Sequence, residues 1–372
     1  MADALKTFFN PALVRRLADD LASVMPRFSR AAFVAQATQG LGALELLERG
    51  RHIMRAMRDH LPPEYPRAVE VIVKSLGPPH ATDELEGVGM GPFFYLPHTQ
   101  FVGTYGLDHF DVSMDAQHAL TQRFTCEWSI RGFIAKDPER TFGYLKKWAR
   151  DKSPHVRRLV SEGTRPRLPW AGHVAWLDAN PRRIVELLQL LVDDPATVVR
   201  RSVANNLNDL GKLDSDLLVE TCQGWLAEET PERRALVEHA LRSAVKRGEP
   251  KALALLGFGG GAKVDIEEVK LAPRRVAIGD KVSIELTVRN ALGRSKQSVL
   301  VDLVVHFVKA NGKPSPKVFK LSRAELAPGG RATFKKTISL AVHTTRKPQR
   351  GRHAVDVLIN GQPWPVGAFD VV

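Results

Sequence analysis

Three acidic residues, Glu127, Glu162 and Asp209, have the types and the spacing for joint chemistry. Glu127 and Glu162 each stand four residues after an arginine, and Asp209 stands one helical turn after Asn205, which takes the same place in a related segment. Residues four apart share a helix face, so consecutive helices could bring these carboxylates to one surface, where they would stabilise a positive charge or activate a water molecule. On spacing alone, Arg–Glu ion pairs along solvated helices are the favoured interpretation.

The segment SEGTRPRLPW, residues 161–170, places further groups after Glu162. A glycine ends the expected helix, and two prolines keep the residues before them out of helical conformation. Arg165, Arg167 and Trp170 are therefore expected on an extended segment at the helix end. Guanidinium groups bind phosphate, and an indole offers a flat face to a sugar, a base or a cation. The alternative is that Trp170 fills the core while the arginines only solvate a loop.

A repeat of 43 residues runs through the part of the chain that holds these side chains. Residues 137–163 align with residues 180–206 without a gap, and each copy begins with Asp-Pro or Asn-Pro, which is a helix start. Residues 231–241 fit as a third, less strict copy. A period in the low forties with two helices per copy is typical of HEAT-type repeats, which stack into a superhelical solenoid with a concave face. We therefore predict an all-α HEAT-like-repeat solenoid over residues 1–256.

Paired basic residues recur at equivalent positions of the repeat. Arg157 and Arg158 in one copy match Arg200 and Arg201 in the next. Equivalent positions of stacked repeats form a row, so these arginines are predicted to contact DNA phosphates. The alternative is a row of solvated charges on the convex face.

The composition changes at the glycine-rich segment 257–262, which we predict to be a linker. Beyond it, β-branched residues alternate with polar ones, and turn-rich pieces separate the alternating runs. This pattern predicts an all-β, immunoglobulin-like sandwich over residues 263–372. Strands are expected at 281–290, 298–309, 331–342 and 353–361.

Nearly all of the excess positive charge lies in this second part. The whole chain carries 54 Lys and Arg against 41 Asp and Glu, a net charge of +13. Residues 262–372 hold 20 of the basic and 9 of the acidic residues, a net charge of +11. Charge concentrated in one module favours a polyanionic partner, and nucleic acid is the first candidate. Arg346, Lys347, Arg350 and Arg352 form the densest basic loop, which we predict to contact DNA; the alternative is that it serves solubility.

The sequence also excludes several classes of protein. No apolar run approaches the roughly 18 residues of a membrane span, and the N-terminal residues do not resemble a secretory signal, so a cytoplasmic location is expected. Cys126 and Cys222 are too few for a disulfide framework or a cysteine zinc site, and the histidines lack the spacing of metal ligands. No metal and no cofactor are therefore expected. Trp128 and Trp148 occupy apolar helical positions and are expected in the core.

The repeat and the segment 161–170 resemble the AlkC branch of the HEAT-like-repeat alkylpurine DNA glycosylases. The resemblance covers residues 1–256, and the segment is its more specific part. Some members of this branch carry a C-terminal immunoglobulin-like domain, which agrees with residues 263–372. The resemblance implies a base-excision-repair enzyme, and a solenoid that wraps DNA is expected to act as a monomer. Its partner would be double-stranded DNA, from which it removes cationic alkylated bases such as 3-methyladenine and 3-methylcytosine, without flipping the base into a pocket.

The resemblance also assigns roles to residues of this chain. Glu162, Asp209 and Glu127 would be the carboxylates that face the deoxyribose, and Trp170 would be the aromatic contact. Cleavage passes through an oxocarbenium-like sugar, which carboxylates and an electron-rich ring face stabilise. A cationic base leaves without being protonated, so no general acid is required. The rival hypothesis is a non-catalytic HEAT-repeat scaffold that binds DNA or protein.

Overall fold

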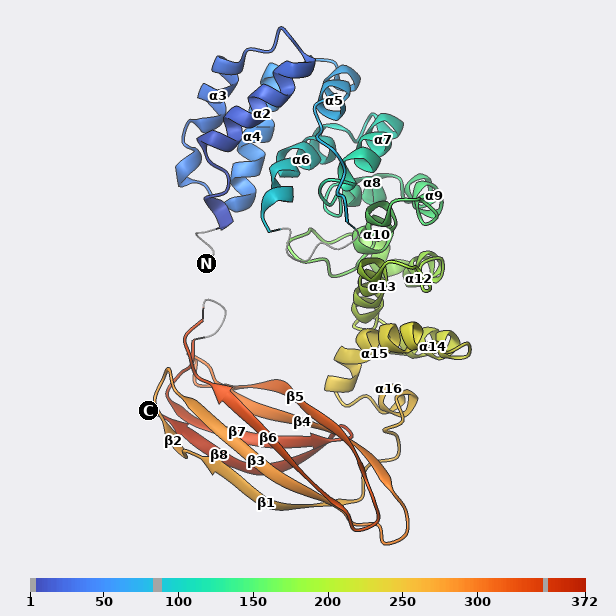
Figure 1. Cartoon of the computed structure of the whole chain (residues 1–372), viewed down its shortest axis with the longest axis vertical. Helices are drawn as coiled ribbons and strands as arrows, with labels where there is room; N and C mark the ends of the chain where they lie inside the picture. Colours follow the sequence, from blue (N-terminus) through green and yellow to red (C-terminus); the bar gives the residue numbers. More distant parts are fainter. Residues whose placement is uncertain (1–4, 83–88, 344–346) are drawn as a thin grey trace. The chain divides into compact units, whose positions relative to one another are not determined.

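The chain folds into two compact units. The computed structural model describes residues 5–82, 89–343 and 347–372. By their contacts the residues divide into Met1–Ala240 and Leu241–Val372 (Figure 1). The first unit is helical, and the second contains the end of helix α15 (Pro231–Lys246), helix α16 (Pro250–Leu255) and all of the strands. The predicted order, a helical solenoid followed by a β-sandwich, is confirmed.

The helices of the first unit follow one another through short connections. They are α2 (Pro11–Val24), α3 (Arg30–Thr38), α4 (Leu46–His60), α5 (Tyr65–Lys74), α6 (Leu96–Tyr105), α7 (Phe110–Thr121), α8 (Ile130–Lys136), α9 (Pro138–Trp148), α10 (Pro154–Gly163), α11 (Ala175–Ala179), α12 (Pro181–Gln189), α13 (Thr197–Leu210) and α14 (Ser215–Leu226), with α15 begun in this unit. Two 3₁₀ turns, Leu41–Ala43 and Gly91–Tyr95, precede α4 and α6.

The predicted repeats are pairs of helices. Helix α9 begins at a proline after Asp137, whose side chain accepts a hydrogen bond from the Arg140 N–H at 3.1 Å. Helix α12 also begins at a proline, after Asn180, whose side chain does not cap the helix. Proline suits these positions because the first helical N–H groups have no partner within the helix. Helices α9 and α12 pack against α10 and α13 respectively, and α10 packs against α13. In Figure 1 these four helices form two rows, with α9 and α12 in one row and α10 and α13 in the other.

Buried polar contacts fix the register of α10 against α13. The Ser161 hydroxyl donates to the Ser202 hydroxyl at 2.5 Å, and the Asn206 amide donates to the Ser161 carbonyl at 2.7 Å. These three residues are buried, so their hydrogen bonds form in competition with little water and strongly favour one alignment. The alignment sets where Glu162 on α10 and Asp209 on α13 lie relative to each other.

The second unit contains two β-sheets. Its strands are β1 (Val264–Ala272), β2 (Arg275–Val276), β3 (Lys281–Asn290), β4 (Gln297–Val308), β5 (Pro314–Leu326), β6 (Arg331–Ser339), β7 (Gly351–Ile359) and β8 (Gln362–Val371). One sheet has the order β1-β3-β6 and the other β2-β8-β7-β4-β5; β2 pairs in parallel with β8, and the other pairs are antiparallel. The four predicted strands correspond to β3, β4, β6 and β7.

The alternating pattern of these strands buries one side of each sheet. In β7, for example, Val355, Val357 and Ile359 are buried, while the residues between them are not. They share a core with Leu286 and Val288 of the opposite sheet. Side chains with a period of two point to one face of a strand, which is why the sequence pattern was informative here.

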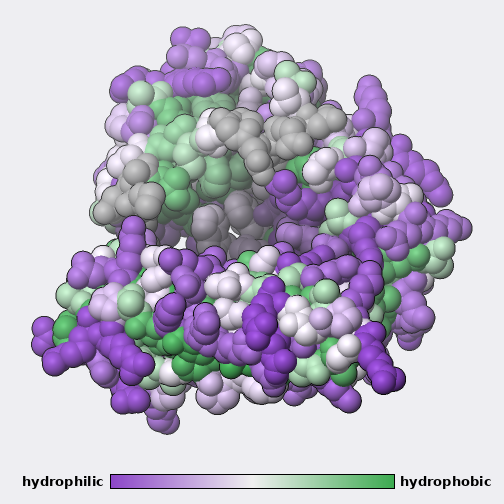
Figure 2. Space-filling model, turned by 60° about the horizontal axis from the view of Figure 1, so that its bottom comes forward, coloured by the Kyte–Doolittle hydropathy of each residue, from purple (hydrophilic) through white to green (hydrophobic). Residues whose placement is uncertain are grey.

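Hydrophilic residues cover much of the surface seen in Figure 2, with hydrophobic patches between them. Most of the largest fully buried side chains, such as Phe33, Phe101 and Phe133, lie inside the helical unit, and Phe369 lies in the sandwich. Across the three described ranges, every helix is too short or too polar to serve as a membrane span.

Candidate active site

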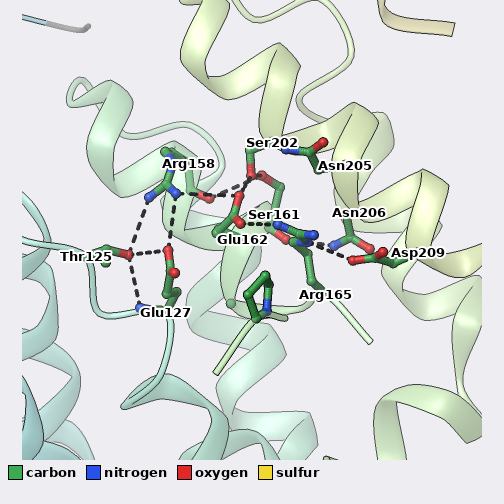
Figure 3. A network of polar contacts seen from close by, with 12 residues as sticks. Thr125, Glu127, Arg158, Ser161, Glu162, Arg165, Ser202, Asn205, Asn206 and Asp209 are labelled. Carbon is green, nitrogen blue, oxygen red and sulfur yellow. Dashed lines mark hydrogen bonds and ion pairs between the residues drawn. The ribbon is translucent and has the colours of Figure 1, made fainter. Parts of the chain in front are cut away.

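Five charged side chains form a chain of alternating sign across three segments of the helical unit (Figure 3). Arg158 lies between two carboxylates, 3.2 Å from Glu127 and 3.6 Å from Glu162. Arg165 continues the chain, 2.5 Å from Glu162 and 2.9 Å from Asp209. The structure thus brings the three predicted carboxylates into one network, joined by two guanidinium groups.

Glu127 reaches this network from a loop rather than from a helix. Residues 122–129 connect α7 to α8, so the predicted helical spacing of Arg123 and Glu127 is wrong. Arg123 donates instead to the backbone carbonyls of Gly77 and Ala119, at 2.7 and 2.8 Å. The Thr125 hydroxyl holds Glu127 by donating to Oε2 at 2.7 Å. Loop geometry rather than helix periodicity therefore places this carboxylate.

Glu162 fits both interpretations of the Arg–Glu spacing, an ion pair along one helix and a meeting of carboxylates from different segments. Its contact with Arg158 is an ion pair within α10, as ordinary helical spacing gives, but Arg158 also reaches across to Glu127. The Ser202 hydroxyl on α13 donates to Glu162 Oε2 at 2.6 Å. Glu162 is 5% exposed, so its carboxylate is held from two helices inside the unit.

The surrounding cations decide the ionisation of this buried carboxylate. Burial by itself would raise the pKa of Glu162, but Arg158, Arg165 and the Ser202 hydrogen bond outweigh burial and lower that pKa. Burial alone would likewise lower the pKa of Arg165, and the carboxylates of Glu162 and Asp209 raise it instead. Glu162 therefore carries a negative charge at neutral pH.

Trp170 stands at the surface next to this network. Its side chain is 65% exposed, so the alternative in which it fills the core is wrong. Its φ of +62° lies in the left-handed region, which is unfavourable for a residue with a large side chain. The ring stacks on Trp128, with centroids 6.3 Å apart, and the Trp128 N–H donates to the Pro169 carbonyl at 3.2 Å.

A cavity of about 370 Å³ joins the aromatic and acidic groups. Glu127 and Glu162 line it together with Arg158, Arg165 and four aromatic rings. These rings are Phe93, Phe124, Trp128 and Trp170. Trp128 was expected in the core, but it is only partly buried and forms part of this wall. The one sequence signal for it was its position directly after Glu127.

Two of the predicted phosphate contacts already have partners inside the protein. Arg157 forms two hydrogen bonds with the Asp194 carboxylate, at 2.5 and 2.9 Å, and its side chain is 12% exposed. Arg200 donates to the backbone carbonyls of Asp194 and Pro195, at 2.6 and 2.9 Å. These bonds tie α10 and α13 to the turn before α13. Either arginine would have to break these hydrogen bonds before it could contact a phosphate.

The other predicted arginines of the helical unit differ in their surroundings. Arg158 and Arg165 belong to the charged network. Arg167 forms two hydrogen bonds of 3.0 Å with the Asp178 carboxylate near the surface. Arg201 is exposed and lines a separate cavity of about 350 Å³ between α13 and α15.

The predicted basic loop of the sandwich can be described only in part. Lys347, Arg350 and Arg352 are exposed to solvent. Arg346 lies outside the described residues. These three side chains are therefore accessible to a polyanion.

A buried arginine that the sequence analysis missed holds the segment bearing Trp170. Arg131 on α8 is 5% exposed and donates to the carbonyls of Arg165 at 2.7 Å, of Gly172 at 2.9 and 3.2 Å, and of Gly163 at 3.3 Å. Burial lowers the pKa of Arg131, but guanidinium remains charged in proteins. Backbone carbonyls on both sides of Trp170 thus converge on one cation, which sets the path of the segment.

The described part of the chain contains no group of three His, Cys, Asp or Glu residues arranged to hold a metal ion.

The architecture defines a class of protein: a helical-repeat unit with an acidic, aromatic-lined cavity, followed by an immunoglobulin-like domain. The family model of the C-terminal immunoglobulin-like domain of the uncharacterised protein YhaZ matches residues 265–372. The uncharacterised protein YhaZ of Bacillus subtilis is 31% identical over 363 residues, 97% of each chain. The Pseudomonas fluorescens alkylpurine DNA glycosylase AlkC, solved bound to DNA with an abasic-site analogue, matches with 32% identity, 99% coverage of both chains and a TM-score of 0.90. The chain belongs to the AlkC family of HEAT-like-repeat alkylpurine DNA glycosylases.

Replacing Arg131 by Met should loosen the segment that carries Trp170. The substitution removes the donors of four hydrogen bonds to backbone carbonyls but keeps much of the side-chain volume, so amides of residues 164–174 should exchange with solvent at least tenfold faster. Hydrogen-exchange mass spectrometry measures this directly. Arg167→Met, which removes the surface pair with Asp178 and one hydrogen bond to the Pro166 carbonyl but none of the bonds from Arg131, is the matched control. Unchanged exchange in the Arg131 variant would contradict this role.

Proposed function

We propose that this protein is a DNA glycosylase that hydrolyses the N-glycosidic bond of alkylated bases in double-stranded DNA, as a step of base excision repair. The observation that carries the proposal is the network of Glu127, Glu162 and Asp209 beside the exposed ring of Trp170. The relationship to AlkC over nearly the whole chain supports the same reaction class. The enzyme acts as a monomer on DNA.

The carboxylates act by electrostatics. As the bond to the base breaks, positive charge develops on the deoxyribose, and fixed negative groups stabilise that charge without reorganising. Glu162 is suited to this because its lowered pKa keeps it ionised and its ion pairs keep it in place. Trp170 presents its ring face to the same sugar and adds a cation–π contribution.

Glu127 is the group that positions the attacking water. Its Oε2 accepts hydrogen bonds from Thr125 and Arg158. Its Oε1 accepts none from the described residues, and Glu127 lines the cavity. A water bonded to Oε1 can lose a proton to the carboxylate as it attacks the oxocarbenium-like carbon.

The leaving base receives no proton from this site. Burial lowers the pKa of His80, a further residue of the cavity wall, so its imidazole is neutral at physiological pH. Glu162 is ionised for the reasons above. The substrates are therefore bases that depart unprotonated because they already carry a positive charge, such as 3-methyladenine and 3-methylcytosine.

Base flipping is not part of the proposed mechanism. Enzymes that flip a base read its edge with dedicated hydrogen-bonding groups. In this cavity the side chains of Thr125, Glu127, Arg158, Glu162 and Arg165 bond to one another. The remaining wall is largely aromatic, so it can recognise flatness and positive charge rather than a pattern of donors and acceptors.

A non-catalytic DNA-binding scaffold is the second candidate. Its support is the net charge of +13 and the exposed basic loop. A scaffold, however, gains nothing from carboxylates near phosphates, which would repel them.

Replacing Glu162 by Gln should separate the two candidates. Base release should fall about 100-fold, because one negative charge facing the sugar is lost, while DNA affinity changes little. Release of 3-methyladenine from methylated duplex DNA, measured by chromatography, together with fluorescence anisotropy for binding, gives both quantities. Glu220→Gln, at an exposed residue paired with Arg182, is the control. No base release by the wild type would favour the scaffold, and equal activity of the Glu162 variant would remove this residue from the reaction.

The pH profile should report the arginines around Glu162. A lowered pKa keeps this carboxylate ionised above that pKa, so wild-type rates should hold into acid and fall only as the pH drops through it. Arg158→Gln removes one of the cations that lower the pKa, so the acid limb should move to higher pH. Single-turnover rates with saturating enzyme measure the limb. Lys212→Gln removes only an ion pair with Asp209, so it should leave the acid limb in place. Equal profiles for wild type and Arg158→Gln would argue against this electrostatic assignment.

The basic loop of the sandwich should contribute to the salt dependence of DNA binding. Each phosphate contact lowers the slope of log affinity against log salt by about 0.9 units, so the double variant Lys347→Gln/Arg350→Gln should flatten the slope by about 1.8. Binding titrations at several salt concentrations provide the slope. The double variant Lys281→Gln/Arg294→Gln removes the same charge at exposed residues elsewhere in the sandwich. Identical slopes for the two variants would mean that the loop serves solubility.

A further inference from the structure

A second cavity shares the tryptophan pair with the first. Trp128 and Trp170 line both the cavity with the carboxylates and a neighbouring cavity of about 290 Å³. The second cavity is formed by α4, α6, the start of α8 and the loop before α8. The two cavities therefore share an aromatic wall, and a ligand that passes one face of Trp170 is close to both.

The two cavities differ in charge. Glu127 and Glu162 line the first, whereas the lining of the second has one cation, Arg51 from α4, and no carboxylate. Its other polar side chains are uncharged and come mainly from α6, Thr104 among them. At Gly103 and Gly132 the wall has no side chain at all. A small anion is the ligand that matches one guanidinium among neutral polar groups.

Arg51 is available to such a ligand. It is exposed, and within the described ranges it forms no hydrogen bond and no ion pair. The same holds for the hydroxyl of Thr104. Arg157, Arg167 and Arg200, by contrast, already bind carboxylates or carbonyls of the protein. Guanidinium groups bind phosphate oxygens in pairs, and hydroxyls add a further donor.

We propose that this second cavity binds a phosphodiester of the DNA strand, next to the deoxyribose that Trp170 contacts, with Arg51 and Thr104 as its ligands. The inference rests on the proposed function, because the sugar at Trp170 defines which strand passes the cavity. A backbone that runs over the shared aromatic wall would place its sugar towards the carboxylates and its neighbouring phosphate towards Arg51. Negative phosphate is thereby kept apart from Glu127 and Glu162, which it would otherwise meet at close range.

The test uses the full chain and a duplex with one tetrahydrofuran abasic residue. Arg51→Gln should weaken binding about tenfold and lower the salt slope by about one unit. Arg55→Gln is the matched control, because Arg55 is exposed one turn further along α4 and does not line the cavity. Arg51→Lys keeps the charge and should recover part of the affinity. Circular dichroism of each variant checks the fold.

A second set of duplexes identifies the phosphate. Each carries one neutral methylphosphonate at a position flanking the abasic residue. At one position the wild type should lose about tenfold, and Arg51→Gln should lose nothing further, since the contact is already gone. Losses that add at every flanking position would overturn the proposal, as would equal effects of Arg51→Gln and Arg55→Gln. The affinity lost in Arg51→Gln could instead disappear when a neighbouring base is removed and persist when a phosphate charge is removed. That result would assign the cavity to a base and would also overturn the proposal.

Binding and base release fail independently. Coupling of Arg51 to one phosphate in a protein that releases no base would refute the glycosylase while keeping the phosphate site. Base release without such coupling would refute the phosphate site alone.

Discussion

The charged network of the site depends on the burial of Glu162 between two arginines. An isolated carboxylate at this depth would become protonated or would destabilise the fold, because a charge in a low-dielectric interior has a large desolvation cost. Arg158 and Arg165 offset that cost from opposite sides, and the Ser202 hydroxyl satisfies a further lone pair. Arg158 also pairs with Glu127, and Arg165 also pairs with Asp209. The two arginines that stabilise the charge of Glu162 therefore position all three acidic groups.

This balance explains why the site spans several structural segments. Asp209 comes from α13 and Glu162 from α10, and the serine and asparagine contacts between these helices set their alignment. Glu127 comes from the loop before α8, and α8 also supplies Arg131 to the segment that carries Trp170. A shift of one helix pair against the next would therefore separate charges that need each other, and the network itself resists such a shift.

Sequence patterns predicted what depends on local periodicity. The 43-residue repeat and its Asp-Pro and Asn-Pro starts predicted the helix pairs, and period-two alternation predicted β3, β4, β6 and β7. The segment 161–170 marked Glu162 and Trp170 as neighbours in space. The loop position of Glu127, the partly exposed Trp128 and the buried Arg131 were missed, because each follows from contacts between segments distant in sequence. Strands β1, β2, β5 and β8 were missed as well. The proline-containing start of β5 reads as a turn, and most of its side chains are not buried.

The anchor supplied by Arg131 has a consequence for how this site can change over evolutionary time. It grips peptide carbonyls, which every amino acid provides, and it ignores the side chains of the segment it holds. Substitutions at the exposed positions of this stretch, Arg167, Pro169 and Trp170, can therefore alter what the surface displays without removing that support, whereas Arg165 is tied to the charged network. Diversification towards other adducts is open to this short stretch at small risk to folding.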